Sequence, residues 1–264
     1  MNPHRTPIAL TIAGSDPSGG AGIQADLKVF HQHGVYGMSV ITLLTVQNTV
    51  NVEQVQVLDS ALVSDQLAAV LDDIPPQAAK TGALGAAPVI AAVSRAATHF
   101  RFPLVVDPVM VSTHGAALLE SDAIKVVLDE LLPAALLITP NMDEAALLTD
   151  RPVKDLEQMI VAAEQLRARG AQNVLIKGGH LPHEACDVLL TDELTLLPSP
   201  RIETPHTHGT GCALSAAITA NLACGVPLPE AVLHAKSFIS EAIETNPQLG
   251  HGRGPLNFFA SGRQ

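Results

Sequence analysis

Residues 8–34 read IALTIAGSDPSGGAGIQADLKVFHQHG. A short apolar run at 8–14 leads into a turn rich in glycine, and an amphipathic segment follows the turn. Apolar runs of this length that end in turn residues are typical of buried strands, whereas apolar residues at three- and four-residue intervals are typical of helices. The stretch therefore predicts a strand, a tight turn and a helix, which together form the repeating unit of an α/β fold.

The same order continues along the chain. Further apolar runs that end in polar turns are expected to form strands at 38–46, 103–111, 134–141 and 173–180. Helical patterns occupy 21–34, 60–74, 88–100 and 156–170. This alternation predicts a mostly parallel sheet that is covered by helices on both faces. Residues 186–202 alternate like a hairpin at one edge of the sheet. No linker divides the chain, so we expect residues 1–264 to form one domain.

Composition excludes several classes of protein. The net charge is −11 and no Lys/Arg cluster is present, which argues against a nucleic-acid partner. The apolar stretch near the N-terminus is too short for a membrane span or a signal peptide. The three cysteines, Cys186, Cys212 and Cys224, have no close spacing, so a disulfide framework is not expected. We therefore expect a soluble cytoplasmic protein.

Polar residues and glycines gather where the predicted strands end. In open parallel sheets, ligands bind in the crevice beyond the carboxyl ends of the strands. Five loops are therefore expected to converge on one site, and they contain Gly14–Gly22, Gln47–Thr49, Asp107, Asn141 and Lys177–His180.

Two of these loops contain carboxylates whose role the pattern leaves open. In the first loop, Asp16 or Ser18 is expected to cap a tight turn, or the loop's backbone N–H groups approach a ligand. Asp26, on the helix that follows, is expected to be a solvated or capping residue. Asp107 ends a buried strand, where an unpaired carboxylate is costly, so it either caps the next turn or binds Mg²⁺.

Two further loops combine polar side chains with a helix start or with glycine. Asn141 and Glu144 have the spacing of a helix cap and its reciprocal carboxylate, and the same geometry suits a metal–phosphate group. Lys177 precedes Gly178 and Gly179, which suggests a phosphate contact with open backbone N–H groups. A solvated lysine before a turn is the alternative.

The stretch HGTGCALSAAITANLACG, residues 208–225, carries the strongest single signal. Gly209, Thr210 and Gly211 form a turn before a helix of small residues, whose unpaired N–H groups make an anion hole. Cys212 lies in the first helical turn, where the helix dipole is expected to lower the pKa of its thiol. The neighbouring histidines show no zinc-binding spacing.

The motifs AGSDPSGGAGIQADLK, VITLLTVQNT, DPVMV, ITPNMDEA, LIKGGH, HGTGCALSAAI and LGHGRGPLNFF together resemble the hydroxymethylpyrimidine/phosphomethylpyrimidine kinases of thiamine biosynthesis, a family of the ribokinase-like superfamily. The resemblance spans almost the whole chain. It implies a three-layer α/β/α fold with a central, mostly parallel sheet. The implied reaction uses ATP and Mg²⁺ to phosphorylate 4-amino-5-hydroxymethyl-2-methylpyrimidine to its monophosphate and then to its diphosphate.

The resemblance also implies a substrate side of the site. Gly14, Asp26, Gln47 and Val109 match the positions that line the pyrimidine pocket in this family. Gln47 is expected to read the aminopyrimidine edge, because an amide can donate and accept at once.

The resemblance implies a nucleotide side of the site as well. Asp107, Asn141 and Glu144 match positions associated with Mg²⁺ and nucleotide phosphates, with Asp107 and Glu144 as the metal ligands. Residues 177–179 match a nucleotide-side loop.

The catalytic loop implied by the resemblance is 209–212. The family carries cysteine at the position of Cys212, where the wider superfamily carries the aspartate that deprotonates the substrate hydroxyl. We expect Cys212 to be the activating group, with a neutral thiol that only shapes the pocket as the alternative.

Two departures from the family pattern concern substrate preference. Ala83 stands where many members carry a methionine that borders the ring. Ser112 and His114 replace a lysine and a serine in the loop after DPVM, where a lid with a hinge at Gly115 is expected.

The second candidate function is that of a pyridoxine/pyridoxal kinase. A third candidate, which is not an enzyme, is a non-catalytic ligand-binding module. A dinucleotide-dependent oxidoreductase is disfavoured because the first turn lacks G-x-G-x-x-G. A homodimer is expected by analogy with the family.

Overall fold

The computed structural model describes residues 6–110, 123–179, 181 and 185–262. Its strands form one nine-stranded sheet in the order β3-β2-β1-β4-β5-β6-β7-β8-β9. The strands are β1 (Ile8–Ser15), β2 (Tyr36–Gln47), β3 (Val52–Val57), β4 (Ala78–Thr81), β5 (Leu104–Val106), β6 (Leu137–Ile138), β7 (Asn173–Ile176), β8 (Ala185–Leu190) and β9 (Leu194–Ser199). The pairings from β2 through β7 are parallel, and β3, β8 and β9 add antiparallel pairings at the two edges.

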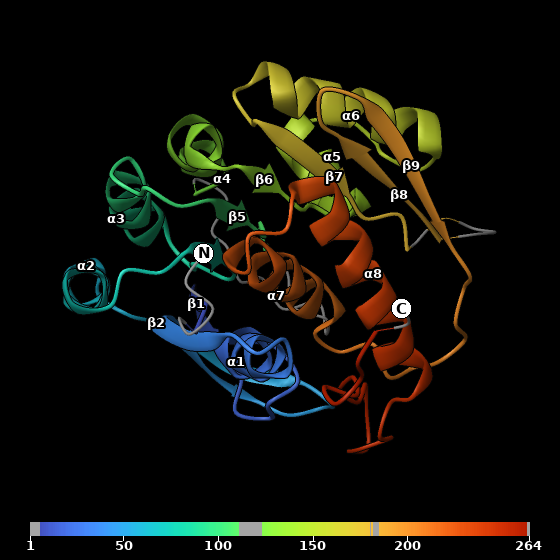
Figure 1. The fold of residues 1–264 in the computed structure, drawn as a ribbon, viewed down its shortest axis with the longest axis horizontal. Coiled ribbons are helices and arrows are strands. Elements are labelled where there is room, and N and C mark those ends of the chain that lie inside the picture. Colours follow the sequence, from blue (N-terminus) through green and yellow to red (C-terminus); the bar gives the residue numbers. More distant parts are fainter. Residues whose placement is uncertain (1–5, 111–122, 180, 182–184, 263–264) are drawn as a thin grey trace.

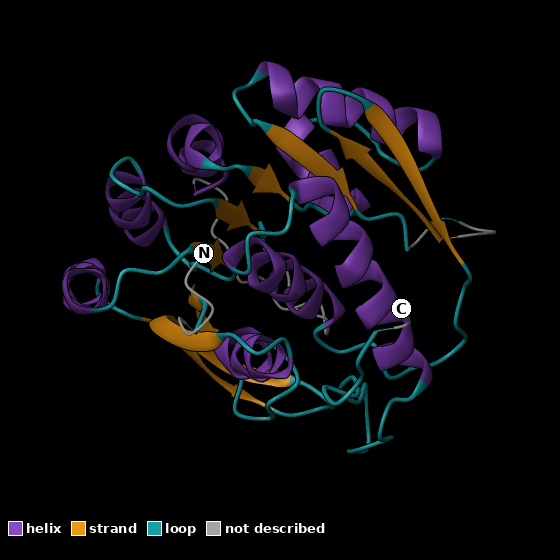
Figure 2. Cartoon of the chain, in the orientation of Figure 1, coloured by secondary structure: helices purple, strands orange, loops and turns teal. Residues whose placement is uncertain are grey.

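Helices cover both faces of this sheet, which gives three layers (Figures 1 and 2). One face carries α1 (Gly22–Gln32), α7 (Thr210–Ala223) and α8 (Leu228–Glu244). The other face carries α2 (Ser60–Asp73), α3 (Ala87–Ala97), α4 (Ala123–Val126), α5 (Met142–Thr149) and α6 (Leu156–Ala168), with a π-helical segment (Val127–Leu131) and a 3-10 turn (Leu132–Ala134) after α4.

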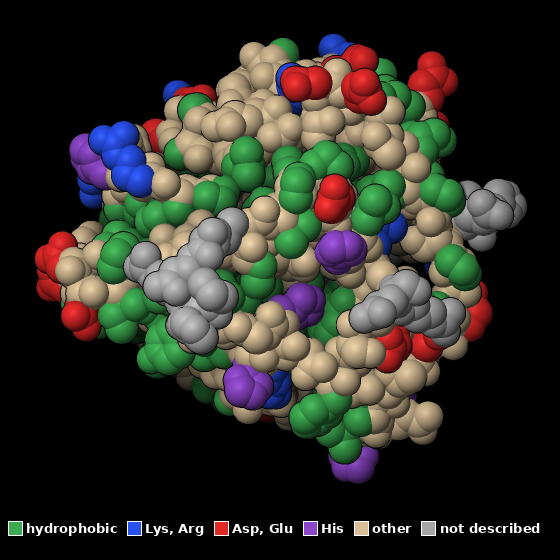
Figure 3. Space-filling model, viewed as in Figure 1, with side chains coloured by type: hydrophobic (Ala, Val, Ile, Leu, Met, Phe, Trp, Pro, Cys, Tyr) green, Lys and Arg blue, Asp and Glu red, His purple; other side chains and the backbone are tan. Residues whose placement is uncertain are grey.

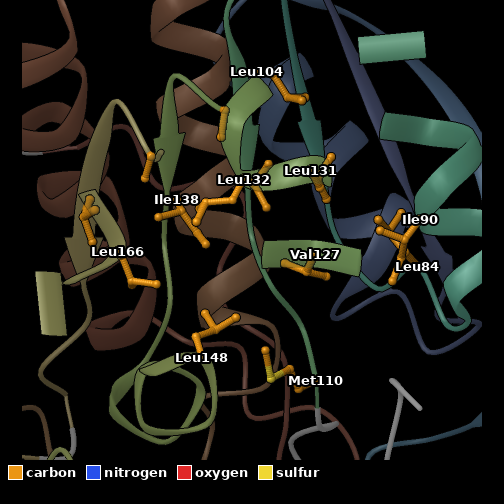
Figure 4. Packing of buried hydrophobic residues seen from close by; sticks show 14 of the residues in the cluster. Leu84, Ile90, Leu104, Met110, Val127, Leu131, Leu132, Ile138, Leu148 and Leu166 are labelled. Carbon is orange, nitrogen blue, oxygen red and sulfur yellow. The ribbon is translucent and has the colours of Figure 1, made fainter. Parts of the chain in front are cut away.

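Two hydrophobic clusters fill the spaces between the layers. Successive residues of a strand point to opposite faces, so Ala9 of β1 joins the cluster under α1, α7 and α8, whereas Leu10 joins the larger cluster on the other face. Figure 4 shows part of the larger cluster, in which Leu104 and Ile138 of the sheet lie near Leu131 and Leu132. Burial on both faces explains why these strands read as continuous apolar runs.

The predicted fold class is confirmed, and so is the edge hairpin, which is formed by β8 and β9. The strands β5 and β6 are shorter than predicted from the runs 103–111 and 134–141. Pro108 and Pro140 lie just beyond these strands, and proline cannot donate a ladder hydrogen bond. The edge strand β3 and the helix α8 were not predicted.

Lysine and arginine side chains are scattered over the face drawn in Figure 3 and form no continuous patch there. Within the described ranges, none of the helices combines the length and the apolar character that a bilayer span requires.

Candidate active site

The carboxyl ends of the parallel strands β2, β1, β4, β5, β6 and β7 lie along one edge of the sheet, as predicted. Strand ends, loops and the helices α1 and α5 near this edge contribute three groups of contacting side chains. We call them the Lys177 cluster (Lys177, Asp107 and Glu144), the Lys80–Asp26 pair and the His208 group (His208, Asp16 and Gln47).

The Lys177 cluster joins loops that follow three neighbouring strands. Lys177 Nζ lies 3.1 Å from Asp107 Oδ1 and 3.8 Å from Glu144 Oε2. Burial raises the pKa of Glu144 to about 7, although Lys177 acts in the opposite direction. Burial also raises the pKa of Asp107, but the charges of Lys177 and Lys80 outweigh it and hold that pKa below its usual value. The cluster therefore holds Lys177 against an ionised Asp107, so Lys177 is not the solvated lysine of the alternative reading.

Asn141 and Glu144 form the predicted helix cap. The Asn141 side chain accepts from the Glu144 N–H at 2.9 Å, and Glu144 Oε2 accepts from the Asn141 N–H at 2.8 Å. This capping box confirms the reading from spacing, and it fixes the carboxylate of Glu144 beside Lys177.

The N-terminus of α7 lies beside the Lys177 cluster. Gly209 is the N-cap, with φ of +80°, and a Cβ there would lie 1.8 Å from the carbonyl oxygen of Gly20. A Cβ on Gly211 would lie 3.1 Å from Lys177 Nζ, so the lysine faces the first turn of the helix. Ser215 Oγ donates to Asp107 Oδ2 at 3.1 Å and ties the helix to the cluster. Helix N–H groups and an ammonium group thus face the same space, which suits an anion.

Cys212 lies in the first turn of α7, but the expectation that its pKa is lowered is wrong. Burial raises the pKa of its thiol to about 11, and the charge of Lys80 offsets this only in part, while Asp26 and Asp107 raise the pKa further. The helix dipole alone is too weak to outweigh lost hydration and two nearby carboxylates.

Asp26 is not the solvated or capping residue expected from periodicity. It is fully buried, Oδ1 accepts from Lys80 Nζ at 2.8 Å, and Oδ2 accepts from Thr11 Oγ1 at 2.6 Å. Lys80, which is also fully buried, was not among the predicted site residues. The signal was available, since a lysine inside the apolar segment AAKTG requires a buried partner.

The His208 group connects the first loop, the end of β2 and the start of α7. Asp16 caps the turn, which was one of the alternatives left open for this loop, because it accepts from the N–H groups of Ser18 and Ala21. His208 Nε2 lies 2.8 Å from Asp16 Oδ2 and 3.3 Å from Gln47 Nε2. No role was predicted for His208, because both partners lie far from it in the chain.

The glycines after Lys177 differ from the expectation of open backbone N–H groups. The Gly178 N–H donates to Asp187 Oδ1 at 2.8 Å, so it is already engaged. A Cβ at Gly178 would lie 1.9 Å from the carbonyl oxygen of Cys186, and only glycine fits there. Gly179 is exposed.

The remaining candidates lie at the same edge of the sheet. Gly14 is buried, and a Cβ there would lie 2.5 Å from Leu43 Cδ1. The Val109 N–H donates to the Asp107 carbonyl, and the carbonyl of Ala83 accepts from Thr42 Oγ1. The predicted lid, with residues 112, 114 and 115, lies outside the described residues, and so does residue 180.

Two solved structures that share this architecture are kinases. An ADP complex of Bacillus subtilis pyridoxal kinase has a TM-score of 0.89 and 40% sequence identity, covering 97% of this chain and 98% of that chain. A phosphomethylpyrimidine kinase from Clostridium difficile has a TM-score of 0.80 and 42% identity, covering 90% of this chain and all (100%) of that chain. The sheet and the similarity to these structures therefore define a kinase of the ribokinase-like fold.

Sequence comparison identifies the family. The phosphomethylpyrimidine kinase family profile matches residues 16–257. The hydroxymethylpyrimidine/phosphomethylpyrimidine kinase of Rhizobium meliloti is 51% identical over 259 residues, which cover 96% of this chain and 97% of that protein. The chain belongs to the phosphomethylpyrimidine kinase family.

Proposed function

We infer that this chain is an ATP-dependent kinase that phosphorylates 4-amino-5-hydroxymethyl-2-methylpyrimidine to its monophosphate and then to its diphosphate in thiamine biosynthesis. The similarity to the Rhizobium meliloti relative, which is named for both kinase activities, carries this inference. The Lys177 cluster beside α7 supports it, because phosphoryl transfer depends on positioning and on charge stabilisation.

On the nucleotide side, we propose that Asn141, Glu144 and Lys177 face the phosphates of ATP, with Gly178 and Gly179 in the loop beside them. The ADP bound to the Bacillus subtilis pyridoxal kinase supports ATP as the co-substrate. The N–H groups at residues 209–211 are proposed to hold the transferred phosphoryl group at the end of α7.

We propose Asp107 and Glu144 as the residues that hold Mg²⁺. Within the described ranges, no group of three or more potential metal-ligating side chains forms a cage. Two hard carboxylates beside a phosphate site suit Mg²⁺, because this ion takes further ligands from nucleotide phosphates and water. When bound, it would neutralise charge on the phosphates.

On the substrate side, Gly14, Gln47 and Val109 are proposed to line the pyrimidine pocket. Gln47 supplies hydrogen bonds to the ring edge. We propose that Asp26 stabilises the wall of this pocket without contacting the substrate, since both of its oxygens are hydrogen-bonded within the protein and it is fully buried.

We propose that the 209–212 loop is catalytic, and the raised pKa of Cys212 favours a thiol that shapes the anion hole over a thiolate base. Single-turnover phosphorylation by Cys212→Ala and Cys212→Asp separates these roles. A near-wild-type rate in Cys212→Ala removes the base role. A loss of about 100-fold that Cys212→Asp restores would instead support proton transfer at this position.

The assay that tests the function uses purified protein with ATP and Mg²⁺. Hydroxymethylpyrimidine, its monophosphate and pyridoxal are offered separately. We expect turnover of both pyrimidines. Turnover of pyridoxal alone would support the second candidate, a pyridoxal kinase, which the similarity to the Bacillus subtilis enzyme favours. Turnover of none of the three would support a binding module.

We also propose three properties of the whole chain: that it forms a single domain over residues 1–264, assembles as a homodimer and acts in the cytoplasm. One continuous sheet supports the first proposal. The absence of a disulfide-compatible cysteine pattern supports the third.

A further inference from the structure

Asp16, in the turn between β1 and α1, is a buried carboxylate with four donors around it. Oδ1 accepts from the N–H and the hydroxyl of Ser18, and Oδ2 accepts from the Ala21 N–H and contacts His208 Nε2. Burial raises the pKa of Asp16, but the hydrogen bonds from His208 and Ser18 outweigh it and lower that pKa overall. The group that faces the imidazole is therefore an ionised carboxylate.

A carboxylate oxygen accepts hydrogen bonds and cannot donate them, so the His208 atom that faces it must carry a hydrogen. Nε2 of His208 is therefore an N–H, in the neutral ring and in the charged ring alike. The side chain has no room to move away, because His208 is 1% exposed and a Cβ at Gly20 would lie 2.4 Å from its Cδ2. Packing and charge together fix which ring nitrogen is protonated.

Gln47 contacts the same ring nitrogen, at 3.3 Å from its own Nε2. The N–H groups of Gln47 Nε2 and His208 Nε2 are both donors and cannot form a hydrogen bond with each other. A half-turn of the Gln47 amide exchanges its oxygen and nitrogen within the same volume. After that half-turn, Oε1 of Gln47 accepts from the same imidazole N–H that donates to Asp16 Oδ2. We propose that His208 is a positioning residue that fixes Gln47 with its amide oxygen on the imidazole and its amino group toward the ligand.

This inference deepens the proposed function and rests on it, because Gln47 is there the residue that reads the substrate ring. A free glutamine side chain can both donate and accept. With its oxygen turned toward His208, Gln47 presents only its amino group to the ligand, and an amino group can only donate. The site then selects a ring edge that presents an acceptor, such as an aromatic nitrogen, and discriminates against an edge that presents an N–H.

The first test concerns the ligand-free protein and does not depend on activity. Long-range ¹H–¹⁵N spectra of ¹⁵N-labelled protein at neutral pH distinguish protonated from bare imidazole nitrogens, and the His208 signals are assigned by comparison with His208→Gln. We expect a protonated Nε2. A bare Nε2 at His208 would overturn the proposal, whatever substrate the enzyme uses.

The second test compares two substitutions of Gln47. Gln47→Glu keeps an oxygen for His208 but replaces the amino group with a second oxygen, whereas Gln47→Met removes both polar atoms. We expect KM for hydroxymethylpyrimidine to rise about tenfold more in Gln47→Glu than in Gln47→Met, since a carboxylate oxygen then faces a ring acceptor. An equal or lower KM in Gln47→Glu would mean that the amide oxygen faces the substrate, which contradicts the proposal.

The third test isolates His208 with a double-mutant cycle. His208→Phe keeps a flat ring but loses the N–H, and Asp16 retains its bonds to Ser18 and Ala21. We expect KM to rise about fivefold in the presence of Gln47 and to stay unchanged in Gln47→Met, with kcat little altered. Additive effects would indicate a purely structural role and overturn the proposal.

Two controls accompany the cycle. His208→Gln restores an N–H donor and is expected to recover most of the KM, and thermal unfolding confirms that each variant is folded under assay conditions. A wild-type protein that phosphorylates no heteroaromatic alcohol would contradict the proposed function, and the NMR result would still decide the state of His208.

Discussion

Lys80 and Asp26 are both fully excluded from solvent, and their charged atoms lie 2.8 Å apart. Removing two charges from water costs several kcal/mol per ion, and only a close partner offsets it. Thr11 donates to the second oxygen of Asp26, so both oxygens of this carboxylate have hydrogen-bond donors within the protein. At the scale of the residue, the intact pair therefore contributes little net stability, but the loss of either member leaves the other as a costly buried charge.

The substitution Lys80→Met tests this dependence, because it leaves Asp26 as an unpaired buried charge. We expect the free energy of unfolding to fall by about 3–5 kcal/mol in urea denaturation. Lys154→Met, at an exposed position, is the control and should change stability by less than about 0.5 kcal/mol. A loss below about 1 kcal/mol in Lys80→Met would show that an unpaired Asp26 costs little.

Cys212 provides a prediction on pH dependence. A pKa of about 11 means that the thiol is protonated at neutral pH, and that below pH 11 the thiolate fraction increases about tenfold with each unit by which the pH rises. In a protein that carries Cys186→Ala and Cys224→Ala, the rate of iodoacetamide modification should therefore rise continuously from pH 7 to pH 10. A plateau below pH 8 would indicate a lowered pKa.

At the scale of the element, the start of α7 depends on a contact between two backbones. Gly209 adopts a left-handed conformation and its Cα faces the carbonyl oxygen of Gly20, so the loop after β1 and the helix approach more closely than any side chain permits. This contact places the N–H groups of the first helical turn beside Lys177.

Gly209→Ala should therefore displace the start of α7, with a fall in kcat of about 100-fold, the scale of losing an aligned N–H donor. Gly34→Ala is a matched control, since Gly34 also has a positive φ but a Cβ added there would meet no atom within 4 Å. It should cost only about 1 kcal/mol of stability and leave kcat unchanged. Wild-type kcat in Gly209→Ala would refute the role of the close contact.

At the scale of the whole molecule, the order of the strands assembles the site. β1, β4, β5, β6 and β7 are neighbours in the sheet although helices separate them in the chain, so their carboxyl ends bring distant loops together. Asp107 and Lys177 lie 70 residues apart, yet their side chains form an ion pair across this edge.

The proposed homodimer is a prediction at this same scale. Sedimentation equilibrium should give twice the 27.5 kDa mass of the chain at micromolar concentration. A mass of one chain across the accessible concentrations would contradict the proposal, while leaving the site within each chain unaffected.

The sequence alone was sufficient for features that depend on local pattern. Apolar runs ending in turns predicted the α/β fold, alternation predicted the edge hairpin, and a three-residue spacing predicted the capping box of Asn141 and Glu144. These signals work because backbone hydrogen bonding and the burial of one face act within a few residues. The motifs added the family and, through it, the proposed residues of the site.

Only the tertiary structure decided how the ionisable groups behave. Lys80 pairs with Asp26 across 54 residues, and His208 contacts Asp16 across 192. The raised pKa of Cys212 likewise comes from burial and from carboxylates on other elements, which outweigh the local helix start. Charge interactions and lost hydration depend on which atoms surround a group in space, and residue spacing along the chain does not contain that information.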